Sequence, residues 1–152
     1  MSEKAELIEY EIENEGVLRK SIACKYDWAP GLLITNFTYI GYEVTVAKTG
    51  HRLTHRHERF GMALDLLAKW VLIGKTYGVD WSAEIDARKL AEEIFHKECP
   101  WAEGAGKIID WKNITMLHSL DGVLPEFPWE DDESSPWASA EEVIEQILET
   151  DQ

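Results

Sequence analysis

Three histidines and a glutamate lie within eight residues near the middle of the chain, and zinc and other transition metals favour such ligands. They are His51, His55, His57 and Glu58. A site on one helix face needs ligands four residues apart, and only His51 and His55 have that spacing. They would share a helix face only if the helix began before His51, which Gly50 and Thr54 disfavour.

Three arginines, Arg52, Arg56 and Arg59, are interleaved with these side chains and repel a cation. We therefore interpret the segment as a solvated basic turn that leads into a helix. A metal-binding or hydrolytic site that uses His51, His55 and His57 is one alternative, and an anion or phosphate site is another.

Other catalytic patterns are weak. No catalytic signature surrounds either of the two cysteines, Cys24 and Cys99. The segment Gly104-Ala105-Gly106-Lys107 resembles a phosphate-binding loop only in part, since Ile108 stands where that loop needs a hydroxyl. We expect no cofactor and favour a non-enzymatic protein.

Acidic side chains form the most regular pattern in the sequence. Glu141, Glu145 and Glu149 would stack along one face of a helix, about 6 Å apart. Glu9, Glu11 and Glu13 would point the same way from a strand, with a repeat of about 6.6–6.8 Å. Both intervals are comparable with the spacing of successive phosphates along a nucleic-acid strand.

A third acidic group lies in a segment flanked by prolines. It consists of Trp129, Glu130, Asp131, Asp132 and Glu133. An exposed aromatic ring beside carboxylates suits a basic groove, because the ring anchors the contact while the charges steer association. A solvated surface that keeps the protein soluble is the competing interpretation.

The negative charge is concentrated at one end of the chain. The net charge is −14 and the isoelectric point is about 4.7, which argues against direct binding to nucleic acid or to anionic lipid. Residues 101–152 hold 13 acidic and 2 basic residues, and no Lys or Arg follows Lys112. Solubility alone would not require so local an excess, because Lys alternating with Glu would serve without repulsion between like charges.

We therefore expect a binding protein that engages, and inhibits, a basic protein surface of the kind that binds nucleic acid. In size and charge the chain resembles small acidic proteins that block such surfaces, among them phage-encoded inhibitors of bacterial defence and immunity proteins of nuclease toxins. No motif places it in one family. A structural subunit whose aromatic residues form a homo-oligomer interface is a further alternative.

The elements that carry these residues divide the chain in two. Residues 8–13 and 17–26 alternate apolar and polar side chains on either side of a turn at 14–16, which predicts a hairpin, although Glu, Lys and Ala also favour a helix over the first segment. Residues 32–40 and 42–47 are rich in Thr, Ile and Val and predict two more strands, with a hinge at Gly41.

The second half predicts helices over residues 55–73, 82–97 and 139–150. Thr54 is the expected N-cap of the first and Gly74 its end. Ser139 and Glu142 form a capping box for the last. Residues 108–116 predict a short strand, and the acidic segment 121–137, with three prolines, predicts a loop.

Together these elements predict a single α+β domain over residues 1–152, with an N-terminal antiparallel sheet of about four strands packed by two or three C-terminal helices. No apolar run is long enough to span a bilayer, and the N-terminus is too acidic for a secretory signal. We expect a protein of the cytosol, or of the bacterial host cytosol if a phage encodes it, with no membrane partner.

Overall fold

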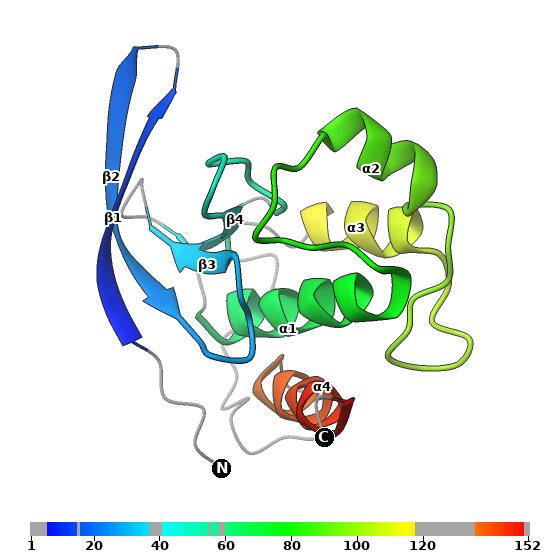
Figure 1. Cartoon of the computed structure of the whole chain (residues 1–152). Coiled ribbons are helices and arrows are strands. Elements are labelled where there is room, and N and C mark those ends of the chain that lie inside the picture. Colours follow the sequence, from blue (N-terminus) through cyan, green and yellow to red (C-terminus); the bar gives the residue numbers. More distant parts are fainter. Residues whose placement is uncertain are drawn as a thin grey trace.

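The N-terminal half of the chain forms one antiparallel sheet whose strands lie in sequence order (Figure 1). The computed structural model describes residues 6–14, 16–36, 41–54, 56–57, 60–117 and 136–150. The strands are β1 (Glu6–Asn14), β2 (Val17–Lys25), β3 (Leu32–Thr35) and β4 (Glu43–Val46). The predicted α+β class and the four-stranded sheet are confirmed.

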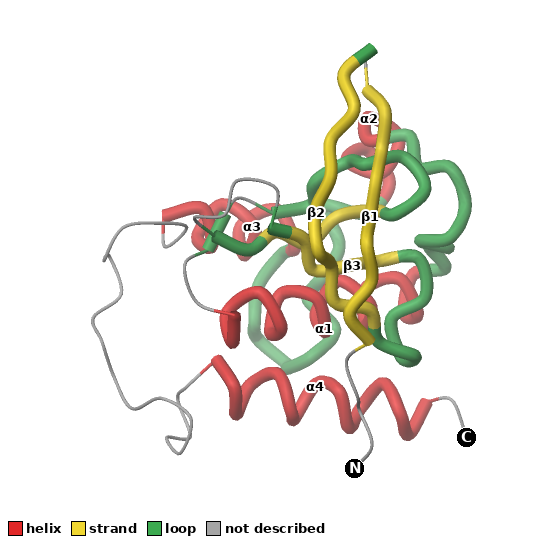
Figure 2. The backbone as a smooth tube through the Cα atoms, turned by 90° about the vertical axis from the view of Figure 1, so that its left-hand side faces the viewer, coloured by secondary structure: helices red, strands yellow, loops and turns green. Residues whose placement is uncertain are grey.

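The β1–β2 hairpin projects beyond the rest of the sheet (Figure 2). The two strands pair along their whole length, from Glu6 opposite Lys25 to Asn14 opposite Val17. By contrast, β2 pairs with β3 only where Cys24 lies opposite Ile34. The predicted hairpin is therefore confirmed, and most of it extends away from the strands that anchor it.

One face of the hairpin packs on a small apolar cluster. Tyr10 and Ala23 are buried there against Leu33, and the Tyr10 hydroxyl donates a hydrogen bond to the Ala47 carbonyl oxygen at 2.7 Å. The side chains on the opposite face of β1 are exposed, as the alternating sequence predicts.

The segment after β4 runs beside that strand instead of starting a helix. The Val46 amide donates to the His51 carbonyl, and the Leu53 amide donates to the Val44 carbonyl, each at 2.8 Å. The Val44 amide donates to the Thr54 hydroxyl at 3.1 Å. Thr54 is therefore not the helix N-cap that we predicted, because its hydroxyl serves the neighbouring strand.

Helix α1 (Phe60–Tyr77) lies at the centre of the molecule, between the sheet and helix α4 (Pro136–Thr150) (Figures 1 and 2). Twelve of its residues are buried, among them Leu67, Trp70 and Ile73. The predicted end at Gly74 is wrong, because the helix continues one turn to Tyr77. Gly74 is where Trp81 packs against the helix, as the close approach of the indole shows.

Two shorter helices lie on the opposite side of α1 from α4 (Figure 1). Helix α2 (Ala87–Glu93) is shorter than predicted, because the Asp86 carboxylate caps it by accepting from the amides of Arg88 and Lys89. Helix α3 (Ile108–Leu117) replaces the predicted strand. Its β-branched and aromatic residues suggested a strand, but the Trp111 ring packs on Trp70 at 5.3 Å between centroids.

Helix α4 packs along α1 with a buried stripe of Ala140, Val143, Ile144 and Ile147. It begins at Pro136, so Ser139 lies inside its first turn and not at the predicted N-cap. Proline is well tolerated at the first helical position because no amide is needed there. None of the helices among the described residues has the length and apolar character needed to cross a membrane.

Candidate protein-binding surfaces

The predicted carboxylate ladder on β1 is present and exposed. Glu9, Glu11 and Glu13 alternate with Ile8, Tyr10 and Ile12, which lie on the packed face. The ladder is not purely acidic, since Lys20 lies opposite Glu11 and its Nζ is 3.5 Å from the carboxylate. Both partners are more than half exposed, so this ion pair contributes little to stability.

The same face of the hairpin also carries exposed apolar side chains. Glu9 lies opposite Ile22, Glu13 opposite Leu18, and Leu7 opposite Cys24. Leu7, Leu18 and Ile22 are all more than half exposed. The sequence did not single out these residues. Leu7 lies two residues before Glu9 on β1, but Leu18 and Ile22 join this face only through their pairing with Glu13 and Glu9 across the hairpin.

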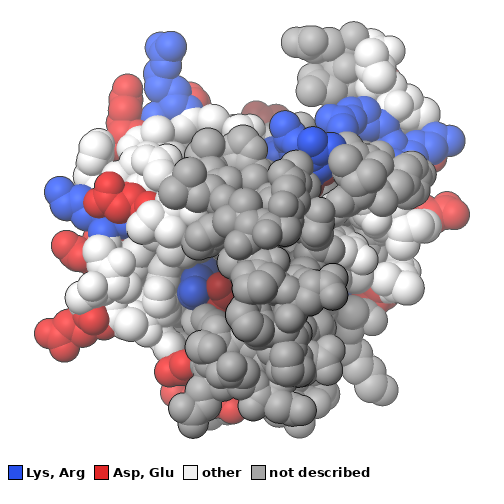
Figure 3. Space-filling model, turned by 180° about the vertical axis from the view of Figure 1, so that it is seen from behind, with Lys and Arg blue, Asp and Glu red and all other residues white. Residues whose placement is uncertain are grey.

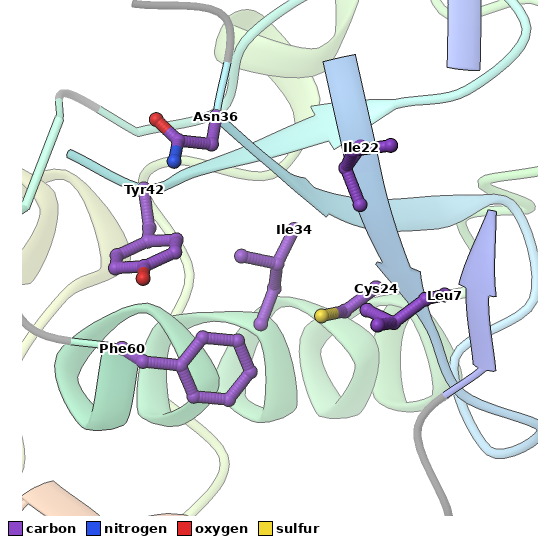
Figure 4. A pocket seen from close by; sticks show the side chains of 7 residues that line it. All are labelled: Leu7, Ile22, Cys24, Ile34, Asn36, Tyr42 and Phe60. Carbon is purple, nitrogen blue, oxygen red and sulfur yellow. The ribbon is translucent and has the colours of Figure 1, made fainter. Parts of the chain in front are cut away.

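A mainly apolar hollow of about 340 Å³ begins where these side chains reach the rest of the sheet (Figure 4). Its lining joins the open end of the hairpin, where β1 begins and β2 ends, to β3 and to the start of α1. The lining residues are Leu7, Ile22, Cys24, Ile34, Asn36, Tyr42 and Phe60. Burial raises the pKa of the Cys24 thiol, so the thiol is protonated at neutral pH and serves as an apolar wall.

The second predicted ladder lies on the outer face of α4. Glu141, Glu145 and Glu149 are exposed, and so is Glu142. At 3.6 residues per turn, these four carboxylates fall within about 100° of the helix circumference, opposite the stripe that packs on α1. The helix contains no Lys or Arg, so it presents carboxylates without neighbouring cations of its own.

The two ladders occupy separate surfaces. Strand β1 pairs with β2, whereas α4 packs on α1, and the two elements do not contact each other. Seen from behind, one group of Lys and Arg side chains lies at the upper right, and others lie separately toward the left and centre, interspersed with Asp and Glu side chains (Figure 3). The described surface is therefore a set of local charged patches.

The third acidic group cannot be placed beside them. Trp129, Glu130, Asp131, Asp132 and Glu133, and most of the predicted loop 121–137, lie outside the described residues. The proposed role of this segment in partner binding stays a prediction.

The histidine segment lies along β4. The His57 backbone pairs with Tyr42, and its side chain is buried, whereas His51 is exposed at the turn. Partial burial, and then the charges of Lys112 and Arg52, lower the pKa of His51. His55 and Glu58 lie outside the described residues, and no three potential ligands within the described ranges come together to hold a metal ion.

An ion pair between Glu43 and Arg52 in the same region was not predicted from the sequence. The Glu43 side chain is fully buried on β4, and its Oε2 accepts a hydrogen bond from Arg52 Nη1 at 3.2 Å. Its other oxygen, Oε1, has no hydrogen-bond donor within the described part of the chain. Arg52, which we expected to repel a cation in a basic turn, instead compensates this carboxylate.

Several tryptophans expected at an oligomer interface belong to the core. Trp28, Trp70 and Trp81 are buried, and Trp101 and Trp111 pack against the same core. These five rings are therefore used within the chain, while the aromatic interface stays a prediction for the other two.

Comparison with protein-family models, with curated proteins and with solved structures finds no match for this chain. Functional inference therefore rests on the surfaces themselves.

Proposed function

We propose that this chain is a non-enzymatic binding protein whose acidic α4 face engages, and blocks, a basic surface on another protein. The observation that carries the proposal is the set of four exposed carboxylates on one side of α4, in a helix without Lys or Arg. The apolar side of the same helix is committed to α1, so the acidic side is the one available to a partner.

Repulsion between the exposed glutamates lowers the stability of α4 unless a positive charge neutralises them. Glu145 has a like charge one turn away on each side, at Glu141 and Glu149. Each such pair destabilises a helix by about 0.2–0.5 kcal/mol. A partner that supplies Lys or Arg would turn this repulsion into attraction, and would be steered toward the helix from a distance.

The spacing favours a partner that normally binds nucleic acid. Successive glutamates of the ladder rise by about 6 Å along the helix axis, an interval comparable with that of phosphates along a nucleic-acid strand. A groove that holds phosphates presents cations at such intervals. An acidic helix in that groove would exclude the nucleic acid, which is the inhibition that we propose.

Affinity capture from a bacterial lysate, at low and moderate salt, tests the proposal. The bait is the full chain, compared with a variant that carries Glu141→Lys, Glu145→Lys and Glu149→Lys. We expect the wild-type chain to retain a basic protein that the variant loses, and we expect retention to weaken as salt rises.

A matched control separates the α4 face from overall charge. Glu84→Lys, Glu92→Lys and Glu93→Lys change the net charge by the same amount at three exposed positions in and before α2, which does not contact α4. The control should keep the partner. An unchanged set of captured proteins with the α4 variant would contradict the proposal, and equal loss with both variants would reduce it to a net-charge effect.

A further inference from the structure

The face of the sheet that α1 covers is left uncovered on the hairpin. Ile34 and Val44 point toward α1 and belong to its core cluster. Cys24 pairs with Ile34 and so lies on that same face, which continues along β2 to Ile22. Helix α1 contacts β3 and β4 but neither hairpin strand. A step therefore forms where the helix layer ends and the hairpin extends past it.

The hollow lies at this step, and its rim is poorly covered. The exposed fraction of Leu7 is 69% and that of Ile22 is 57%. In Figure 4 these two side chains lie on the hairpin side of the hollow, while Tyr42 and Phe60 lie on the other. An apolar side chain placed between them would extend the core cluster outward and remove both rims from water.

A hollow with two carboxylates and one lysine adjoins the apolar one and shares Ile22 with it. This second hollow, of about 190 Å³, is lined by Glu9, Glu11 and Lys20 together with Tyr10 and Ser21. Glu9 is the cross-strand neighbour of Ile22, so a carboxylate lies directly beside the apolar rim. A ligand that fills both hollows needs an apolar group and a cationic group side by side.

We infer that the hairpin face docks a peptide segment of the partner in which an apolar side chain is flanked by Lys or Arg. The apolar side chain fills the hollow beside Phe60, and a flanking cation lies over Glu9, since Glu11 is already paired with Lys20. The inference rests on the proposed function, since it assigns a second contact to the same basic partner. A second copy of this chain fits poorly, because it would bring another acidic ladder against the first.

Peptide binding measured by fluorescence anisotropy tests the inference with a defined probe. The probe is a labelled peptide, Gly-Lys-Ile-Lys-Leu-Lys-Gly, and two matched peptides carry Glu in place of Lys, or Ser in place of Ile and Leu. We expect the full chain to bind the probe at least about tenfold more tightly than either matched peptide. Equal binding of all three peptides, or no binding of the probe, would overturn the inference.

Single substitutions then locate the site. Ile22→Ser should weaken binding of the probe by about tenfold or more, as loss of an apolar anchor does. Ile114→Ser is the matched control, because Ile114 is 55% exposed on α3, away from the hairpin. Glu9→Gln with Glu11→Gln should weaken binding and flatten its salt dependence. Equal effects of Ile22→Ser and Ile114→Ser would contradict the assigned site.

The outcome is separable from that of the proposed function. The α4 charge reversal should leave binding of the probe peptide intact while it abolishes capture of the protein partner. If the hairpin substitutions change neither peptide binding nor partner capture, the docking inference fails and the α4 proposal stands. Should sedimentation show dimers that Ile22→Ser dissolves, the hairpin face is a self-association surface and the inference is wrong.

Discussion

Glu43 is a carboxylate that is fully buried on a strand of the described sheet. Burying a charge is costly unless a partner compensates it. Arg52 provides that compensation from the turn that follows β4, while nearly half of its own side chain is exposed. The pair therefore links the turn to the strand as well as balancing charge.

Replacing Arg52 with alanine should lower the free energy of unfolding by about 1–3 kcal/mol, because it leaves a buried carboxylate without its cation. Urea unfolding followed by tryptophan fluorescence measures the change. Adding Glu43→Gln to Arg52→Ala should recover part of the loss, since the neutral amide costs less to bury. Unchanged stability in Arg52→Ala would show that the pair contributes nothing.

Individual residues were the hardest scale to predict from sequence. The alternation in β1 placed Glu9, Glu11 and Glu13 on one face, since strand geometry is local. The burial of Glu43 was not predicted, because alternation places it with Thr45 on the polar face of its strand and Arg52 reaches it through a turn. The lining of the hollow was not predicted either, because it draws on five separate parts of the chain.

At the scale of elements, α1 continues past a glycine that was expected to end it, because a tryptophan outside the helix packs on that glycine. Glycine usually ends a helix, yet Gly74 lies inside this one. The Trp81 indole packs where a side chain would be, and its Nε1 donates to the Trp70 carbonyl at 3.0 Å. Packing of one tryptophan therefore requires a glycine that helix propensity alone would disfavour.

Gly74→Ala should destabilise the protein by about 1–3 kcal/mol, because the new methyl group clashes with the Trp81 ring. Helix propensity alone would give the opposite sign, a gain of about 1 kcal/mol. Thr76→Ala, at an exposed position of the same helix, is the control and should be neutral or slightly stabilising. Stabilisation by Gly74→Ala in urea unfolding would contradict this packing.

Repulsion between the carboxylates of α4 should lower the stability of the protein, and one substitution tests this. Glu145→Gln removes two like-charge contacts one turn apart and should raise the free energy of unfolding by about 0.4–1 kcal/mol at low salt. The gain should shrink at high ionic strength, because salt screens the exposed charges that cause it. A loss of stability on substitution would mean that Glu145 makes a favourable contact within the chain.

The elements themselves were largely predictable, and the errors share a cause. Periodicity located both hairpin strands and the apolar stripe of α4. Residues 108–116 were assigned to a strand because Ile, Thr and Trp favour strands. Trp111 instead packs on Trp101 and Trp70 from a helix. Tertiary contacts of this kind override local propensity and leave no short-range signal.

For the whole molecule, the sequence predicted an uneven distribution of charge but not how it divides in space. The α4 face and the hairpin face belong to elements that do not contact each other. A partner that uses both must reach from the outer side of α4, past α1, to the exposed face of the hairpin, or present two separate segments. The hairpin face adds apolar surface, which charge counting along the sequence could not reveal.

Site-specific photo-crosslinking tests directly whether the acidic face of α4 contacts a basic protein. A photo-reactive benzoylphenylalanine in place of Glu142 would lie at the edge of the α4 acidic face and leave Glu141, Glu145 and Glu149 intact, and the same group in place of Glu92 on α2 is the control. We predict that irradiation in a lysate links position 142, but not position 92, to a basic nucleic-acid-binding protein identified by mass spectrometry. Crosslinks from position 142 that match those from position 92, or that reach only acidic proteins, would contradict the account.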